Sequence, residues 1–230
     1  MMFSRPAPVM VAESEALPGR STPMAGVPEK HLVLGTPLKP PFGEGIEVIY
    51  LAGGCFWGIE RIFWRVDGVV STAAGYMGGF TPNPTYEEAC TGRTGHAEAV
   101  MVAYDPQKID TDRIVATFFE NHDPTTPNRQ GNDVGTQYRS AIYCTTPQQE
   151  RIALAAREAF QKVLTKAGHG AITTEIRMAD DTGPFYYAED FHQQYLHRNP
   201  NGYCNHGPHG YTCPVGLVDA PAQTDVLPPK

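Results

Sequence analysis

The chain has 230 residues, and its 18 Lys and Arg against 25 Asp and Glu give a formal net charge of -7 at pH 7. This length suits one domain with one substantial core, and the cations are scattered, so neither nucleic acid nor an anionic membrane surface is an expected partner. No apolar run approaches a membrane span or a secretion signal, and five cysteines, an odd number, do not suggest a disulfide framework. We therefore expect a cytoplasmic protein.

Residues 1–45 contain many prolines and little apolar periodicity, which predicts an irregular extension that wraps the surface or stays loose. From residue 46 the pattern changes. The run IEVIYLAG is β-branched and ended by glycine, as expected of a buried strand, and IERIFWRV has apolar residues at helical spacing. Cys55 therefore falls at a strand-to-helix junction.

Further strands and helices alternate after this junction. HAEAVMVAYDP predicts a strand stopped by Asp105 and Pro106, TDRIVATFFENH predicts a helix with one apolar face, and residues 137–144, QYRSAIYC, predict another strand. The next helix has the clearest start and end signals, with Thr146 as N-cap, Pro147 at the first position, Gln149 completing a capping box and Gly168 as terminator.

The last predicted elements are a strand at AITTEIRMA and a helix at YYAEDFHQQYLHR that Pro200 ends. The segment NGYCNHGPHGYTCPVG is too rich in Gly, Pro, Asn and His to hold regular structure. Alternating strands and helices predict an α/β or α+β domain over residues 46–200, followed by a flexible tail over residues 201–230.

Cys55 has the features of a reactive thiol. At the first turn of a helix it faces unpaired backbone N–H groups and the positive end of the helix dipole, which favour the thiolate. Gly53 and Gly54 let the chain turn and predict open space above the sulfur. Phe56 and Trp57 point in different directions on a helix, so at least one of them can form the wall of a pocket.

Glu98 is the second unusual residue, because strand periodicity places it on one face with Val100 and Val102 while the other face is also apolar. A carboxyl group buried in this way favours its neutral form and is a candidate proton donor; a salt-bridged glutamate at a sheet edge is the alternative. Tyr86 and Tyr138 adjoin turn-rich segments from which a phenol can point into a cleft. Asp133 lies in a glycine-flanked loop that indicates either a site or a plain Asx turn.

The tail contains four possible metal ligands, Cys204, His206, His209 and Cys213. They could bind zinc, although two ligands separated by one residue seldom suit a tetrahedral site. Alternatively, the two tail cysteines are resolving thiols on a glycine-rich arm that carries a sulfur to Cys55. Cys90 and Cys144 are predicted inside or beside strands, where we expect them to be inert.

Several motifs in one order carry a resemblance to a known family. GCFWG, NPTYEEACTGRTGHAEAV, ENHDP, GNDVGTQYRSAIY, FYYAEDFHQQYL and GYC, spread over about residues 46–213, resemble the A-type peptide methionine sulfoxide reductases, and the tail cysteines resemble the three-cysteine bacterial type. The resemblance implies a two-layer α/β sandwich around a ferredoxin-like split βαβ core.

The resemblance also implies roles for individual residues. Cys55 would attack the sulfur of a methionine S-sulfoxide, protein-bound or free, while Glu98 protonates the departing oxygen. Tyr86 and Tyr138 would hydrogen-bond that oxygen. Phe56 and Trp57 would hold the methyl group, and Asp133 would orient the rest of the substrate.

The implied product is methionine and a sulfenic acid on Cys55. Cys204 would condense with this acid, exchange would move the disulfide to Cys213, and thioredoxin, or dithiothreitol as an artificial reductant, would reduce it. No metal or organic cofactor is expected, and we expect a monomeric repair enzyme. One departure from the family pattern is that His206, Pro208 and His209 stand where glycine and aliphatic residues are expected.

Two other classes compete with this interpretation. A cysteine hydrolase would need a histidine as base, for which His96 and His192 are available, although the signature C-G-[SA]-C-[WY] is absent. A zinc-binding interaction module built on the tail is the other class.

Overall fold

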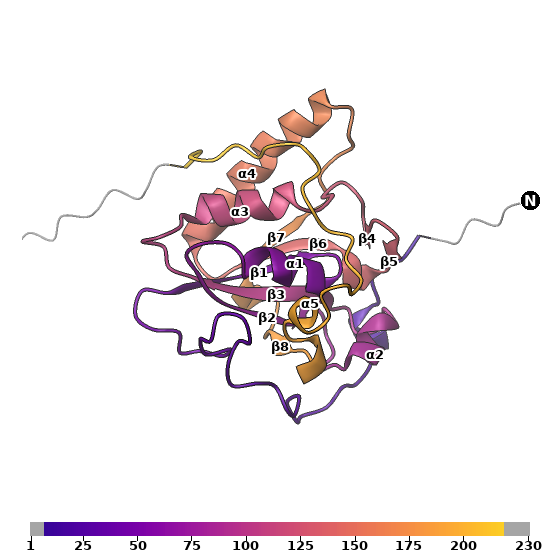
Figure 1. Cartoon of the computed structure of the whole chain (residues 1–230). Helices are drawn as coiled ribbons and strands as arrows, with labels where there is room; N and C mark the ends of the chain where they lie inside the picture. Colours follow the sequence, from indigo (N-terminus) through magenta and orange to yellow (C-terminus); the bar gives the residue numbers. More distant parts are fainter. Residues whose placement is uncertain (1–6, 219–230) are drawn as a thin grey trace, which may run out of the picture.

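The computed structural model describes residues 7–218 (Figure 1). Its main sheet has six strands in the order β7-β6-β1-β3-β2-β8. The pair β6–β7 is parallel and the other four pairs are antiparallel. The strands are β1 Glu47–Gly53, β2 Val69–Met77, β3 Ala97–Tyr104, β6 Ser140–Cys144, β7 Glu175–Met178 and β8 Tyr186–Tyr187, and a separate pair joins β4 Arg129–Gln130 to β5 Asp133–Val134.

Within the described residues, four α-helices lie between strands in the chain, α1 Phe56–Phe63, α2 Tyr86–Cys90, α3 Thr111–Glu120 and α4 Pro147–Lys166, and a fifth, α5 Tyr195–Arg198, follows β8. Strand β3 lies between β1 and β2 and runs antiparallel to both, so β1, α1 and β2 form a split βαβ unit. Helix α3 then leads from β3 to β6, which pairs with the free side of β1. The order β6-β1-β3-β2 confirms the ferredoxin-like α/β core that the resemblance implied.

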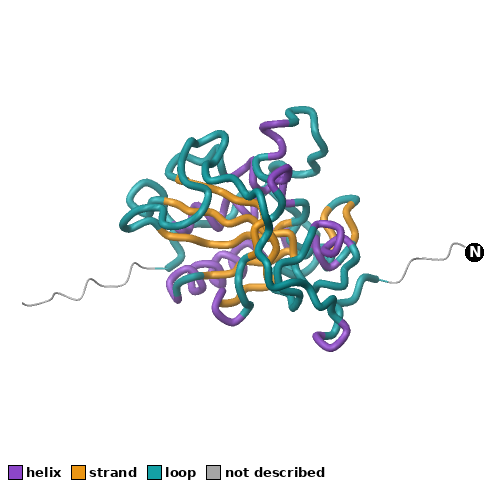
Figure 2. Tube along the Cα trace, turned by 90° about the horizontal axis from the view of Figure 1, so that it is seen from below, coloured by secondary structure: helices purple, strands orange, loops and turns teal. Residues whose placement is uncertain are grey.

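The main core lies between one face of the sheet and helices α1, α3 and α4 (Figure 1). Ile49 and Leu51 of β1 and Val100 and Val102 of β3 point to this face and are fully buried. Helix α3 presents the apolar face expected from its sequence, formed by Ile114, Val115, Phe118 and Phe119. The tube view shows how much of the chain around the strands is loop (Figure 2).

Residues 24–42 of the N-terminal extension cover the opposite face of the sheet. Leu38 is fully buried there, and it packs with Val27, Ala73 and Met101 in a second, smaller core. The extension contains a 3-10 turn at Glu13–Glu15, and irregular structure otherwise over its described part.

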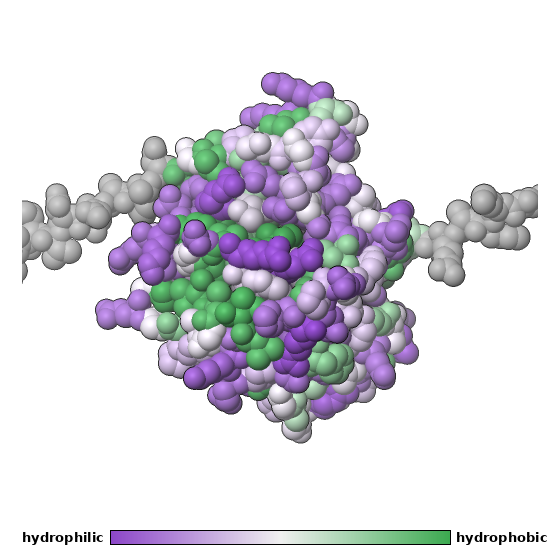
Figure 3. All heavy atoms as spheres, in the orientation of Figure 1, coloured by the Kyte–Doolittle hydropathy of each residue, from purple (hydrophilic) through white to green (hydrophobic). Residues whose placement is uncertain are grey.

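A space-filling view of the helix-bearing side shows hydrophobic residues gathered between polar ones (Figure 3). In the described part of the chain, no helix is long and apolar enough to span a membrane.

The start of α4 differs in one detail from the sequence prediction. Thr146 Oγ1 accepts from the Gln149 N–H at 3.1 Å, as predicted. The Gln149 side chain, however, accepts from the N–H of Thr145 at 2.8 Å and donates to the Val48 carbonyl at 3.0 Å. The bond to β1 draws Gln149 away from the N-cap, so the predicted capping box is not completed. Gly168, at φ +85°, follows the helix end as predicted.

The predicted helix over YYAEDFHQQYLHR is wrong. This segment forms β8, a 3-10 turn at Asp190–His192 and the short helix α5. The buried Gln193 side chain accepts from the N–H of Ala74 and donates to its carbonyl, both at 2.9 Å, and Gln194 has φ +48°. These tertiary hydrogen bonds to β2 and the left-handed residue interrupt a helix that local propensity favours.

Two other features of the strands were not predicted, the start of β6 and the whole of β2. Strand β6 begins at Ser140, because residues Thr136–Tyr138 form a 3-10 turn before it. Strand β2 was not predicted at all, because VVSTAAGYM combines small residues with a glycine and is buried over most of its length. Its absence from the sequence prediction left the split βαβ unit without one of its strands.

Candidate active site

Cys55 occupies the N-cap position of α1, as the sequence predicted, and only 6% of its surface is exposed. Burial raises the pKa of its thiol, and the Glu98 carboxylate raises it further, while hydrogen bonds from the Trp57 and Gly58 N–H groups act in the opposite direction. The N–H groups at the helix start favour the thiolate, as predicted, but they do not decide the direction of the shift. Desolvation outweighs the helix start, and the free protein holds a protonated thiol.

The glycines around Cys55 make room for protein side chains. Gly54 has φ +101°, which confirms the sharp turn, but a Cβ there would lie 2.5 Å from the Cβ of Gln130. A Cβ on Gly58 would lie 2.2 Å from Nδ1 of His206. Gln130 on β4 and His206 in the tail thus pack against these glycines, where the sequence predicted open space.

Glu98 lies on β3 beside the start of α1, and 2% of its surface is exposed. Its Oε2 accepts a hydrogen bond from the Phe56 N–H at 3.0 Å. Burial raises the pKa of this carboxyl to about 8; the Phe56 N–H lowers it and Asp133 raises it. Within residues 7–218 Glu98 forms no salt bridge, so the site presents a protonated carboxyl next to the cysteine at neutral pH.

Tyr86 and Tyr138 approach the same place from two different elements. Tyr86 begins α2, and Tyr138 ends the 3-10 turn before β6. Burial is the main cause that raises the pKa of both phenols, and the Glu98 carboxylate adds to it. Both side chains are consequently neutral hydrogen-bond donors near Glu98.

Phe56 and Trp57 diverge, as predicted. Phe56 is buried to 1% exposure, whereas Trp57 is only partly buried. Trp57 stacks on Tyr195 with ring centroids 3.8 Å apart, and its Nε1 donates to Nδ1 of His192 at 3.0 Å. Neither contact was predicted, because the segment that carries Tyr195 and His192 was expected to be a continuous helix.

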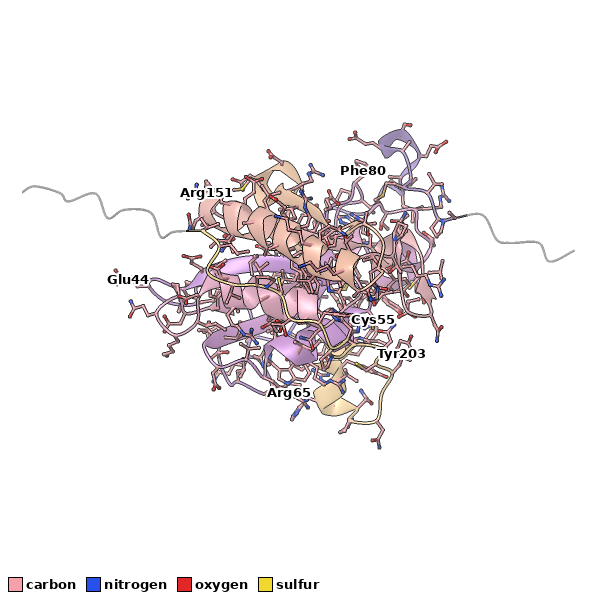
Figure 4. The ribbon with its side chains drawn as sticks, turned by 90° about the horizontal axis from the view of Figure 1, so that it is seen from above. Glu44, Cys55, Arg65, Phe80, Arg151 and Tyr203 are labelled. Atoms are coloured by element: carbon pink, nitrogen blue, oxygen red, sulfur yellow. The ribbon has the colours of Figure 1, made fainter. Side chains whose placement is uncertain are left out.

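Asp133 faces the tail. Its Oδ1 accepts from the Tyr203 hydroxyl at 3.0 Å, and its Oδ2 accepts from the Asn205 side chain at 2.9 Å. Tyr203 lies beside Cys55 (Figure 4), and the pKa of its phenol is raised by burial, by Asp133 and, to a smaller extent, by the Cys55 sulfur. Neither contact was predicted, although Tyr203 belongs to the GYC motif, because an irregular segment has no periodicity to indicate where its side chains point.

Cys204 and Cys213 lie in different environments. Nη2 of Arg61, on α1, lies 2.9 Å from the Cys204 sulfur, and His206 Nε2 is 2.7 Å from the Gly53 carbonyl oxygen. Cys213 is 1% exposed and belongs to the main core, where burial and Glu120 raise the pKa of its thiol to about 12. In residues 7–218, no three His, Cys, Asp or Glu side chains are arranged to hold a metal ion.

The remaining cysteines differ from each other. Cys144 is buried in β6, and burial raises the pKa of its thiol to about 12, which agrees with an inert residue. Cys90 is exposed at the end of α2, so its predicted place inside or beside a strand is wrong. It borders a cavity of about 830 Å³ that also contacts Val134 and Gln137, next in sequence to Asp133 and Tyr138.

The family profile described as peptide methionine sulfoxide reductase matches residues 47–211. The chain belongs to this family. It is 58% identical over 207 residues to peptide methionine sulfoxide reductase MsrA 1 of Synechocystis sp., covering 90% of this chain and 91% of the relative. It is 56% identical over 220 residues to MsrA of Salinispora arenicola, covering 95% and 98%.

Solved structures of the family share the fold. Methionine sulfoxide reductase A of Corynebacterium diphtheriae superposes with a TM-score of 0.81 at 50% identity, covering 90% of this chain and 99% of that one. Reduced Mxr1 from Saccharomyces cerevisiae gives 0.63 at 36% identity, covering 70% and 89%. The chain is thus a methionine sulfoxide-reducing enzyme, which decides against the cysteine hydrolase. His96, one of the bases considered for that enzyme, instead bonds to the Thr81 carbonyl and the Gly79 N–H.

For this reductase we expect Gly58→Ala to detach the tail. Alanine favours the helix by about 0.5–1 kcal/mol over glycine, but its Cβ would occupy the position of the His206 ring. Cys204 should therefore react with iodoacetamide several-fold faster, measured by mass spectrometry of the tail peptide. Gly170→Ala is the matched control, because nothing lies within 4 Å of a Cβ there. Equal alkylation rates in both variants would contradict the packing argument.

Proposed function

We propose that Cys55 reduces the S epimer of methionine sulfoxide, protein-bound or free, with Glu98 as the proton donor. The observation that carries this proposal is the pairing of a buried thiol with a buried carboxyl whose pKa is raised to about 8. Sulfoxide sulfur is a poor electrophile until its oxygen is protonated or strongly hydrogen-bonded. The Cys55 thiol supplies the nucleophile, and the protonated Glu98 beside it supplies the proton that the sulfoxide oxygen needs.

The step balances without a further reagent. The Cys55 sulfur forms a bond to the sulfoxide sulfur and loses its proton, while Glu98 gives a proton to the sulfoxide oxygen. The S–O bond and the new S–S bond then break as the hydroxyl is transferred to the Cys55 sulfur. The products are methionine and the Cys55 sulfenic acid, and the proton lost by the thiol restores Glu98. Cys55 is oxidised by two electrons and the methionine sulfur is reduced by two.

The surrounding residues suit the other parts of this substrate. Neutral Tyr86 and Tyr138 donate to the oxygen as its charge develops. Phe56 and Trp57 offer an apolar surface to the methyl group. Asp133, whose oxygens bind Tyr203 and Asn205, orients the rest of the substrate when the tail yields those contacts.

We further propose that Cys204 resolves the sulfenic acid. The Cys204 sulfur attacks the sulfur of the Cys55 sulfenic acid, and the hydroxyl group leaves as water with the thiol proton. A Cys55–Cys204 disulfide results. The contact with Arg61 supports this role because it holds the Cys204 sulfur against the helix that begins after Cys55. Cys213 then takes over the disulfide and thioredoxin reduces it. For this exchange Cys213 has to leave its buried place against α3 and α4. Because thiols supply all electrons, the cycle needs no metal or organic cofactor.

The first experiment mixes the pure, reduced protein with a blocked S-methionine sulfoxide and counts methionine formed and thiols lost. We expect one methionine with two thiols lost when the cycle stops at one disulfide, or two methionines with three thiols lost when the freed Cys55 reacts a second time. No methionine with all thiols still free would contradict the proposed chemistry. Dithiothreitol should replace thioredoxin in continuous turnover.

Cys204→Ser should separate the attack from the resolving step. We expect about one methionine per enzyme in a single turnover, because Cys55 and Glu98 are intact, but no continuous turnover with thioredoxin, since the sulfenic acid meets no thiol. The sulfenic acid can be trapped with dimedone and located by mass spectrometry. Cys90→Ser is the matched control and should keep thioredoxin turnover. Thioredoxin turnover by Cys204→Ser at the wild-type rate would remove Cys204 from the relay.

A further inference from the structure

We propose that Glu60 is a positioning residue of this active site, because it fixes Gln194 and thereby holds Tyr195 against Trp57. The inference rests on the proposed role of Trp57 as a wall for the substrate methyl group. It assigns a function to a buried carboxylate that the proposed reaction does not use, and it connects the N-terminal extension to the site.

Glu60 lies on α1, one helical turn beyond Trp57, and is fully buried. Its Oε2 accepts from the Gln194 N–H at 2.9 Å, and its Oε1 accepts from the Gln194 side-chain Nε2 at 2.7 Å. The Thr72 hydroxyl donates to Oε1 at 3.2 Å. No lysine or arginine forms a salt bridge with Glu60 within the described residues. These three hydrogen bonds stabilise the carboxylate, and the charge of Arg198 adds to them from a greater distance.

The neighbours of Glu60 can only donate to it. His31 Nδ1 accepts from the N–H groups of Val33 and Leu34, both at 3.1 Å, so the proton of the neutral ring is on Nε2. That Nε2–H donates to the Thr72 hydroxyl oxygen at 2.9 Å, which leaves the Thr72 proton for Glu60. A carboxylate, which has only acceptors, completes this chain, whereas an amide would set a donor against a donor.

Gln194 links the hydrogen bonds of Glu60 to the stacked pair Tyr195 and Trp57. It adopts φ +48°, a conformation that costs a non-glycine residue free energy and persists only where the surroundings hold it. Glu60 holds its N–H and its side-chain amide, and the N–H of Leu32 donates to its Oε1 at 3.2 Å. The next residue, Tyr195, stacks on Trp57 with an interplanar angle of 17°.

His31 and Leu32 belong to the N-terminal extension, so one buried network joins the extension, β2, α1 and the start of α5. The contacts run from His31 through Thr72 to Glu60, and from Leu32 directly to Gln194. The extension therefore does more than cover the second face of the sheet: it supplies two of the contacts that fix the backbone beside Trp57.

Glu60→Gln tests the proposal in single-turnover assays with a blocked methionine sulfoxide at pH 8, where the carboxylate is ionised because burial raises its pKa only to about 7. We expect the substrate concentration at half-saturation to rise about tenfold, since a wall for the methyl group contributes to binding. The rate at saturation should stay within about twofold, because this contact is equal in the ground and transition states.

Glu47→Gln is the matched control. Glu47 also accepts two side-chain hydrogen bonds, partly buried, from Tyr104 at 2.9 Å and Gln149 at 3.1 Å, but at the far end of β1. The Glu47→Gln variant should have a lower melting temperature but an unchanged substrate concentration at half-saturation. The same result for Glu60→Gln would overturn the proposal and leave Glu60 a purely structural residue. Absence of methionine formation in the wild type would contradict the proposed function instead.

A double-mutant cycle shows whether Glu60 acts through Tyr195. If it does, the double variant Glu60→Gln, Tyr195→Ala has the half-saturation concentration of Tyr195→Ala alone; multiplied effects would overturn the proposal. Gln194→Gly is a second test that should not impair folding. Glycine adopts φ +48° without strain, and the substitution removes only the side-chain contacts. It should raise half-saturation several-fold, and a wild-type value would count against the proposal.

Discussion

Cys55→Ser is expected to abolish methionine formation, with single-turnover rates lower by at least about 10⁴-fold. A serine hydroxyl is a far weaker nucleophile toward sulfur, and it has no sulfur to accept the oxygen as a sulfenic acid. The nearby carboxyl of Glu98 does not act as a base for this hydroxyl, because it is itself protonated at neutral pH. The measurement is methionine released from a blocked S-sulfoxide by the reduced protein, followed by chromatography.

The matched control for this variant is Cys90→Ser, which replaces an exposed thiol by the same hydroxyl. It should form methionine at the wild-type rate. Because Cys55 is buried, the melting temperature of Cys55→Ser has to be compared with that of the wild type before the rates are interpreted. A folded Cys55→Ser that still forms methionine would assign the nucleophile to another cysteine.

Glu98→Gln is expected to slow methionine formation by about 10²–10⁴-fold, the usual contribution of a positioned general acid. Glutamine keeps an oxygen that can accept from the Phe56 N–H, so the start of α1 should remain in place. What it loses is the transferable proton. The residual rate should not rise as the pH is lowered, because the variant has no carboxyl to protonate.

The pH dependence of the rate should follow the ionisation of Glu98. Burial raises the pKa of Glu98 from 4.5 to about 8, so the acid is fully protonated below this pH and is lost as the pH rises through it. The ratio of the wild-type rate to the Glu98→Gln rate should therefore be constant below about pH 8 and fall above it. Because the unfolded carboxyl ionises from about pH 4.5 whereas the folded one stays protonated up to about pH 8, the wild type should lose stability relative to the variant across this interval.

Glu47→Gln, on the neighbouring strand, provides the control for a glutamine substitution outside the site. Its rate ratio to the wild type should stay flat across the pH range. A Glu98→Gln protein with near wild-type rates would remove the acid role. A rate ratio that does not change between pH 6 and pH 10 would show that another group donates the proton.

The sequence alone determined the features that depend on local chemistry. A β-branched run ended by glycine and followed by helical spacing placed Cys55 at the N-cap of α1. Period-two alternation placed Glu98 on one face of β3 with Val100 and Val102, and the burial expected there accounts for the raised pKa. The ordered motifs identified the family, because each depends on residue type and spacing, which the chain shows directly.

Only the tertiary structure decided the rest. The ionisation of Cys55 depends on how much water the folded chain excludes from it, and desolvation reversed the expected direction of the pKa shift. Gln193 and Gln194 ended a predicted helix because their amides bind β2 and Glu60, partners more than 100 residues away in sequence. An irregular tail likewise carries no period, so the contacts of Tyr203, Cys204 and Cys213 exist only once the sheet and helices give them a surface. Local propensity is fixed by neighbours in the chain, whereas burial and long-range hydrogen bonds are fixed by neighbours in space.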